Sequence, residues 1–231
     1  MARLPYAIPA QFADLVRLCG LPEHTPQTNA FFMLAHTPAV GARLLQMVFA
    51  LLTQTDLDPR VRELVILRIA ERCHGTYAWG QHVVIARAVG VSDAHIAALE
   101  RGEAPVDLFD DQERTAFDFA DGVLDASRCA DDTFSAVHQI FSPRQVVELL
   151  LLIGYFRMIC GLMTTLDVEA EPPFGVKVLN LTRDTDRTNN KSDSTEKESS
   201  SLQRAVRVAP VDKLGGGIPL VEFHSVLRLS S

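Results

Sequence analysis

Apolar residues recur every three or four positions through most of the first 175 residues, which is the spacing of helices that bury one face. No stretch before residue 176 alternates between apolar and polar residues at every second position, as a half-buried strand does. The pattern therefore predicts an all-α fold. The predicted helices cover about 10–19, 38–54, 59–73, 76–89, 110–124, 131–140 and 143–166, with one short helix after Ser92.

Residues that start and stop helices agree with this division. Asp58-Pro59 begins one helix, because the aspartate accepts hydrogen bonds from the first turn and the proline has no N–H to leave unpaired. Ser142-Pro143 repeats the signal before the longest predicted helix. Gly75 and Gly90 mark the ends of two helices, since glycine tolerates the left-handed conformation found there.

A change of composition near residue 176 divides the chain. Residues 1–176 form the predicted helical domain. Residues 177–204 include the run TRDTDRTNNKSDSTEKESSS, which has almost no apolar side chain to bury and is predicted to be a disordered linker. Residues 205–231 carry a short apolar run after three glycines and are predicted to be a C-terminal appendage.

The charge balance excludes one class of partner. Lys and Arg number 22 against 29 Asp and Glu, which gives a net charge of −7, and no basic stripe is present to neutralise phosphates, so nucleic acid is not an expected partner. The cysteines lie far apart with no C-x-x-C pair, so we expect reduced thiols and the cytoplasm as location. They are Cys19, Cys73, Cys129 and Cys160.

No membrane segment is expected. Prolines stand at the N-terminus where a signal peptide needs its apolar run. The most apolar stretch, Leu149–Met163, is interrupted by Arg157 and falls short of the about 20 residues that span a bilayer. We expect it to be a buried helix.

Functional side chains gather between Arg62 and His82. Glu63 has apolar residues three, four and seven positions later, which predicts that its carboxylate lies on the buried face of the helix. A buried carboxylate needs a partner or a changed protonation state, so a functional acid and a structural ion pair both remain open. His82 has the imidazole that suits general acid–base chemistry, and a hydrogen-bonded core histidine is the alternative.

The spacing of these two residues sets a geometric condition. A helical rise of 1.5 Å per residue places Glu63 about 18 Å and His82 about 10 Å from the break at Gly75. A straight antiparallel hairpin would keep them apart. They meet only if the helices cross steeply, if the first helix ends early, or if they come from different subunits.

Three motifs in this region resemble the carboxymuconolactone decarboxylase / alkylhydroperoxidase-D-like (AhpD-like) family. They are R-E-L-V-I-L-R at Arg62–Arg68, Y-x-W-x-Q-H at Tyr77–His82, and G-V-S-D at Gly90–Asp93, with looser similarity over 29–175. The resemblance implies an AhpD-like multi-helix bundle that forms a homo-oligomer, commonly a trimer or hexamer. The apolar helix at 38–54 is long enough to serve as a subunit contact.

Departures from the family pattern bear on the activity. Peroxidase members carry a glutamate followed by C-x-x-C-x-x-x-H, and aligning on His82 puts Gly75 and Ala78 at the two cysteine positions. Thiol peroxidase chemistry is therefore not expected, and Cys73 is interpreted as structural. Decarboxylase-like members often carry tyrosine five residues before the histidine, as Tyr77 does here, but commonly follow it with glutamate, where this chain has alanine.

The resemblance implies a cofactor-free enzyme that decarboxylates a small carboxylated lactone or keto acid by proton transfer. No cofactor is needed because such a substrate itself holds the developing negative charge. In this hypothesis His82 donates the proton to carbon, Glu63 orients the imidazole, and Tyr77 donates a hydrogen bond to the oxyanion. An isomerase or ring-opening enzyme, and a non-catalytic helical oligomer with a binding or scaffolding role, remain as alternatives.

Three further side chains are candidates for binding the small-molecule substrate. Arg157 and Arg68 offer guanidinium groups that suit a carboxylate, and Trp79 could wall the pocket. Arg157 has the alternative of an ion pair with Asp118 or Glu148. No metal site is expected, because the remaining histidines lack neighbours at ligand spacing, and no glycine-rich phosphate loop indicates a nucleotide cofactor.

Overall fold

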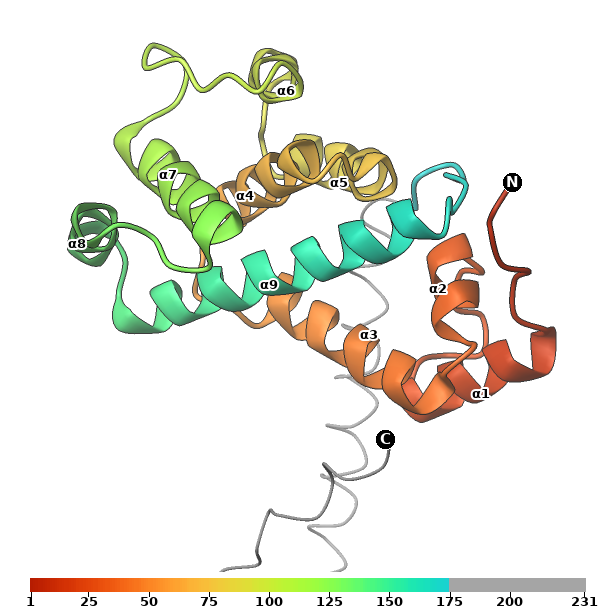
Figure 1. Cartoon of the computed structure of the whole chain (residues 1–231). Helices are drawn as coiled ribbons and strands as arrows, with labels where there is room; N and C mark the ends of the chain where they lie inside the picture. The colour runs from red at the N-terminus through yellow and green to blue at the C-terminus, as the bar shows by residue number, and fades with distance from the viewer. Residues whose placement is uncertain (175–231) are drawn as a thin grey trace, which may run out of the picture. The chain divides into compact units, whose positions relative to one another are not determined.

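The structure, a computed structural model, describes residues 1–174, and these fold into nine helices without a strand (Figure 1). The all-α prediction is confirmed. The predicted linker and C-terminal appendage lie outside the described residues. The helices are α1 (Pro9–Cys19), α2 (Asn29–Leu34), α3 (Pro38–Thr53), α4 (Pro59–Arg72), α5 (Thr76–Ala88), α6 (Asp93–Glu100), α7 (Asp111–Ala126), α8 (Asp131–Ile140) and α9 (Pro143–Thr165).

The predicted caps form as the sequence indicates. The Asp58 side chain accepts hydrogen bonds from the backbone N–H groups of Arg60 at 2.8 Å and Val61 at 3.2 Å. The Ser142 hydroxyl accepts from the N–H of Gln145 at 3.3 Å, and the Gln145 side chain returns a bond to the Ser142 N–H. Each cap satisfies N–H groups that the first helical turn leaves without a partner.

Helix α2 is the one described helix that the sequence pattern does not predict. It has only six residues, too few for an apolar period to repeat. The Thr28 hydroxyl caps it by accepting a hydrogen bond from the N–H of Phe31 at 3.1 Å. This short helix matters for function because it forms one wall of the cavity described below.

Helix α4 lies at the centre of the main hydrophobic core. It contacts α5, α6, α7 and α9, and its side chains from Leu64 to Leu67 have no exposed surface. Helix α9 also contacts α3, α5, α7 and α8, and Figure 1 shows it running past several of them as the longest helix. Apolar residues on every side of α4 are therefore explained by burial from several directions.

Helix α9 is long and apolar enough to cross a membrane by length and composition alone, and it is the one such helix in residues 1–174. Its most apolar 18-residue window has a mean hydropathy of 2.0, and 56% of that window is buried inside the fold. The helix is thus a core element, as predicted.

The apolar side chains of helix α3 pack against other helices of the same chain. The helix contacts α1, α2 and α9, and Leu45, Phe49, Leu51 and Leu52 are buried in these contacts. The apolar face that the sequence offers for a subunit contact is therefore largely occupied by neighbouring helices of the same chain.

The turn between α4 and α5 brings α5 against α9. His74 adopts the left-handed conformation with φ 51°, and the Gly75 N–H reaches back to the Ala70 carbonyl at 2.7 Å. Gly75 itself is required for space, because a Cβ there would lie 2.4 Å from the Cys160 sulfur of α9. The helix break predicted at Gly75 is confirmed, but the residue in the left-handed conformation is His74.

Candidate active site

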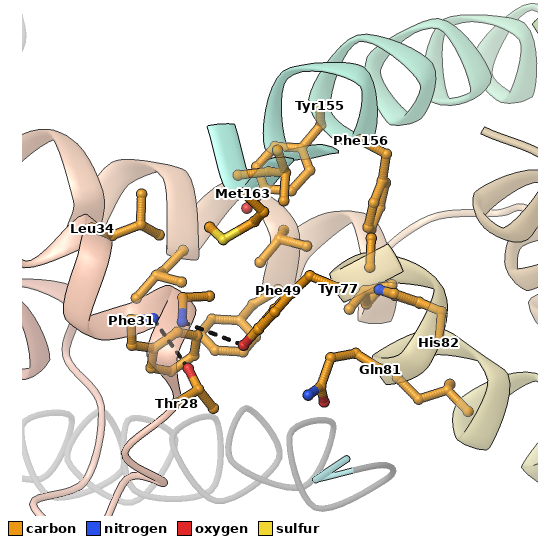
Figure 2. A pocket seen from close by; sticks show the side chains of 17 residues that line it. Thr28, Phe31, Leu34, Phe49, Tyr77, Gln81, His82, Tyr155, Phe156 and Met163 are labelled. Carbon is orange, nitrogen blue, oxygen red and sulfur yellow. Dashed lines mark hydrogen bonds between the residues drawn. The ribbon is translucent and has the colours of Figure 1, made fainter. Parts of the chain in front are cut away.

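A cavity of about 120 Å³ lies between α2, α3, α5 and α9 (Figure 2). Its walls are mainly apolar, and Figure 2 shows aromatic and aliphatic side chains arranged around the space. The polar side chains that line it are Tyr77, Gln81 and His82 of α5, Tyr155 of α9, and Thr28 at the start of α2. An apolar cavity with a few convergent polar groups is the usual form of a small-molecule site. The labelled apolar lining residues are Phe31, Leu34, Phe49, Phe156 and Met163.

His82 and Glu63 form a buried pair at this cavity. The His82 Nδ1 atom lies 2.8 Å from Glu63 Oε2; Glu63 has no exposed surface and His82 has 7%. The His82 ring lines the cavity and packs edge-on against Phe156, with ring centres 4.9 Å apart. With Nδ1–H donating a hydrogen bond to the carboxylate, Nε2 is left without a hydrogen bond among the described residues. That nitrogen is available to a ligand.

Glu63 has a second partner in the neighbouring residue. The Arg62 Nε atom lies 3.2 Å from Glu63 Oε1, and the Arg62 side chain is only 5% exposed. The guanidinium balances the carboxylate charge inside the core, where an uncompensated charge would be costly. Of the two alternatives that the sequence leaves open, the structural ion pair is therefore present, and the same carboxylate also contacts the histidine.

The pair meets within one chain. Helix α4 continues to Arg72, so it does not end early, and no second subunit is needed for this contact. Three conditions could bring the two residues together, and a steep crossing of α4 and α5 is the one that is left.

Tyr77 lines the same cavity but its hydroxyl is already engaged. It donates to Glu171 Oε1 at 2.5 Å and accepts from the Ala30 N–H at 3.3 Å. Burial, and then the hydrogen bond to Glu171, raise the pKa of Tyr77 above its usual range. The phenol therefore remains a hydrogen-bond donor throughout the neutral range.

The two predicted substrate-binding arginines lie away from this cavity. Arg68 faces α7, where it makes paired bonds to Asp121 at 3.2 and 2.7 Å and a third to the Gly102 carbonyl at 2.9 Å. Arg157 is exposed and donates to the Leu124 carbonyl at 3.0 Å. The prediction fails on orientation, because both side chains leave their helices on faces turned away from the cavity.

The aromatic side chain of Trp79 is also elsewhere. It borders a separate hollow beside Glu71 and His74. On a helix with 100° per residue, Trp79 lies about 130° from the centre of the α5 face that lines the cavity. Trp79 is close to Tyr77 and His82 in the sequence, but it lies on a different face of α5.

Three polar residues in or beside the cavity were not singled out from the sequence: Gln81 and Thr28, which line it, and Glu171, which bonds to two of its lining side chains. Gln81 lines the cavity, and its Nε2 atom lies 3.3 Å from Glu171 Oε1. Gln81 belongs to the Y-x-W-x-Q-H motif and lies one helical turn from Tyr77, which was a usable signal. Glu171 follows α9 in an irregular segment, where no periodic pattern indicates its position.

The cysteines in and around this region are poor nucleophiles. Burial raises the pKa of Cys160 to about 12, and burial also raises the pKa of the half-buried Cys73. A thiolate nucleophile requires the opposite shift. Among residues 1–174, no three His, Cys, Asp or Glu side chains lie close enough to hold a metal ion.

Sequence comparison identifies relatives. A model of the carboxymuconolactone decarboxylase family matches residues 38–122. The uncharacterized protein YnjA of Escherichia coli (strain K12) is 30% identical over 122 residues, which are 51% of this chain and 65% of that protein. The match therefore covers slightly less than two thirds of that relative's length.

Structural comparison gives neighbours with the same fold. An alkylhydroperoxidase AhpD core, the uncharacterized peroxidase-related protein of Ralstonia eutropha JMP134, superposes with a TM-score of 0.61 at 16% identity, over 77% of this chain and 96% of that one. The debrominase Bmp8 superposes with a TM-score of 0.54 at 14% identity, over 76% and 89%, and has also been solved in complex with 2,3,4-tribromopyrrole.

The sequence and structure comparisons agree with the helical fold and with the location of the Glu63–His82 pair. At such low identities the structural neighbours establish the fold, while the family model covers both the helix that carries Glu63 and the helix that carries His82. Residues 38–122 therefore match the carboxymuconolactone decarboxylase family, and the described residues share the all-helical fold of the AhpD core.

Proposed function

We propose that this chain is a cofactor-independent enzyme that transfers a proton to or from carbon in a small, largely apolar molecule. The observation that carries the proposal is the His82 imidazole, held at Nδ1 by a buried carboxylate and lining an apolar cavity with no hydrogen bond on Nε2 among the described residues. A histidine held in one tautomer by a carboxylate is a common arrangement for general acid–base catalysis.

Decarboxylation of a carboxylated lactone or keto acid is the preferred reaction, on the basis of the family. The carbon–carbon bond to the carboxylate breaks, carbon dioxide leaves, and the electron pair moves into the conjugated carbonyl system as an enolate. The protonated His82 then donates its Nε2 proton to carbon, and water restores that proton. Glu63 stabilises the imidazolium before the transfer.

The cavity walls suit this reaction without an arginine clamp. No Lys or Arg lines the cavity, so a carboxylate among the apolar side chains beside His82 would have little to replace its water. Loss of carbon dioxide spreads the negative charge into the remaining molecule, so poor solvation of the carboxylate favours the reaction. Isomerisation and ring opening need the same proton transfers and remain alternatives of the same class.

The chain's likeness to a debrominase supports the expected size of the ligand. A pyrrole ring bound to Bmp8 indicates that this fold can hold a single small ring. An engineered cavity of about 150 Å³ in another protein holds benzene, so a single ring is compatible with the cavity here. Thiol-dependent chemistry is not part of the proposal, because the buried cysteine thiols have raised pKa values.

We further propose a homo-oligomer in the cytoplasm, with the exposed face of α9 as the contact. Val147 is 55%, Leu151 47% and Met158 42% exposed. Together with Gly154 and Gly161 they follow a four-three-four-three spacing, the pattern by which one helix packs against another. A second copy fits this face because each copy would present the same apolar stripe. In the non-catalytic alternative, the chain would still associate through the exposed face of α9 but would not transfer protons.

Mass spectrometry of a set of carboxylated lactones and keto acids incubated with the protein tests the activity. Carbon dioxide release that disappears in His82→Ala, with unchanged oligomer mass and helical circular dichroism, supports the proposal. Turnover that survives in His82→Ala would overturn it. If no member of the set turns over, and isomerisation and ring opening are also absent, the non-catalytic alternative is favoured.

A further inference from the structure

We infer that Tyr77 and Gln81 form a binding subsite for the carboxylate of a ligand, and that Glu171 of the same chain occupies this subsite when no ligand is bound. The inference deepens the proposed function, since it concerns the same cavity and adds the chemical class of the ligand. It rests on the hydrogen bonds of the Glu171 carboxylate, which is not part of the Glu63–His82 pair.

The Glu171 carboxylate is held by donors at both oxygens. Oε1 accepts from the Tyr77 hydroxyl at 2.5 Å and from Gln81 Nε2 at 3.3 Å. Oε2 accepts from the Asn29 N–H at 3.2 Å. Two of these donors line the cavity, and Figure 2 shows Tyr77 and Gln81 on the α5 side of it. The cavity therefore carries a set of donors that already binds a carboxylate.

Neutral donors alone hold this carboxylate. No Lys, Arg or His side chain forms an ion pair with Glu171 within residues 1–174. The bond from Tyr77 is short, as expected for an ionised acceptor, and the pKa of the phenol is raised by burial and by Glu171. Because neither partner is a cation, another carboxylate can replace Glu171 without leaving a buried positive charge unpaired.

The segment that carries Glu171 is anchored separately, so this residue can leave without detaching the whole segment. Val168 is buried, and its N–H bonds to the Met163 carbonyl at 3.0 Å. Glu169 accepts from the Tyr6 hydroxyl at 2.5 Å and from the Ala2 N–H at 3.1 Å. Displacement of Glu171 can therefore leave these anchors in place, while the bond from the Phe174 N–H to Gln81 Oε1 at 3.3 Å would have to break.

The positions of the donors define the ligand. Tyr77 and His82 are five residues apart on α5, which is about 7.5 Å along the helix axis. A carboxylate at Tyr77 and Gln81 would thus place the body of a one-ring molecule in the apolar cavity beside His82. The ligand class is a small carboxylate with an apolar body. Where the reaction is decarboxylation, the group that leaves as carbon dioxide is a second carboxylate, and the one bound here stays on the molecule.

Binding of benzoate, measured by calorimetry with the full chain, tests the inference, with benzamide as the uncharged probe of the same shape. In Glu171→Ala the internal competitor is absent, so benzoate should bind about tenfold more tightly than to the wild type while benzamide changes little. Adding Tyr77→Phe to Glu171→Ala should remove the gain. Asp167→Asn is the matched control, because it removes the same charge four residues away from an exposed side chain that makes no ion pair within residues 1–174, and it keeps the anchors of the segment.

Equal gains for benzoate and benzamide in Glu171→Ala would overturn the inference, since the change would then only open the cavity. An equal gain for benzoate in Asp167→Asn would overturn it too, because the effect would then come from the net charge of the segment. His82→Ala separates this inference from the proposed function. In that variant the preference for benzoate over benzamide should persist, because the histidine is not part of the subsite. Turnover in the same variant tests the proposed function independently.

Discussion

Glu63 Oε2 lies 2.8 Å from His82 Nδ1, although the two residues belong to different helices and both are buried. The contact links the most buried helix of the fold to the wall of the cavity. Arg62 completes it, because its guanidinium lies 3.2 Å from the other carboxylate oxygen. The position of the imidazole therefore depends on an ion pair that the core encloses.

Removing this carboxylate should cost stability and loosen the histidine. Glu63→Ala leaves the Arg62 charge buried without its partner, so we expect the free energy of unfolding to fall by about 3–5 kcal/mol in urea melts. Glu63→Gln keeps the shape, and nitrogen NMR should show the His82 proton distributed over both ring nitrogens. Asp14→Ala is the control, because its pair with Arg17 is 55% and 69% exposed and such pairs contribute about 0–1 kcal/mol. A loss as small as that of the control would contradict a structural role for the buried pair.

Much of the fold follows from local patterns, which is why the sequence predicts it. Eight of the nine described helices are predicted, since each repeats an apolar period or carries a capping residue. Helix α2 escapes prediction because six residues do not complete a repeat. Its cap at Thr28 is a single local hydrogen bond, and the sequence alone does not distinguish that from a turn.

The candidate site is predicted less completely, because its members meet through tertiary packing. Periodicity is enough to place Glu63 on a buried face, but the crossing of α4 and α5 that brings it to His82 is not encoded in either helix alone. Arg68 and Arg157 carry guanidinium groups that suit a carboxylate, but their side chains point away from the cavity. Side-chain direction depends on which face each helix turns to its neighbours, and a single sequence gives this only approximately.

Gly75 should be intolerant of a methyl group. In Gly75→Ala the new Cβ would lie 2.4 Å from the Cys160 sulfur, so α5 and α9 must separate. We expect a loss of about 1–3 kcal/mol in the free energy of unfolding. Gly80→Ala on the same helix is the control, because nothing lies within 4 Å of its Cβ, and it should stabilise by about 0.5–1 kcal/mol. Cys160→Ala added to Gly75→Ala should recover part of the loss, and a double variant no better than Gly75→Ala would argue against this contact as the cause.

The thiol of Cys160 should react slowly with alkylating reagents near neutral pH. Its pKa is raised to about 12 by burial, so the thiolate at pH 8 amounts to about one molecule in ten thousand. The reactive form is the deprotonated one, and the rate should therefore rise as the pH increases toward the raised pKa. Mass spectrometry after iodoacetamide treatment checks this, with protein in urea as the control in which all cysteines react. Fast labelling of Cys160 in the folded chain, or peroxide turnover lost in Cys73→Ser, would revive thiol chemistry.

The exposed stripe on α9 should determine the assembly state. Leu151 is 47% exposed at the middle of the stripe, and a charge there would have to be buried between two copies. We expect Leu151→Glu to lower the mass measured by light scattering to that of the monomer, 25.4 kDa, because an unpaired buried carboxylate outweighs the apolar contact. Val106→Glu is the matched control, since Val106 is 76% exposed and lies outside the stripe. The same charge at this position should leave the mass unchanged. If Leu151→Glu keeps the wild-type mass, or the wild type is already a monomer, a second copy does not cover this face.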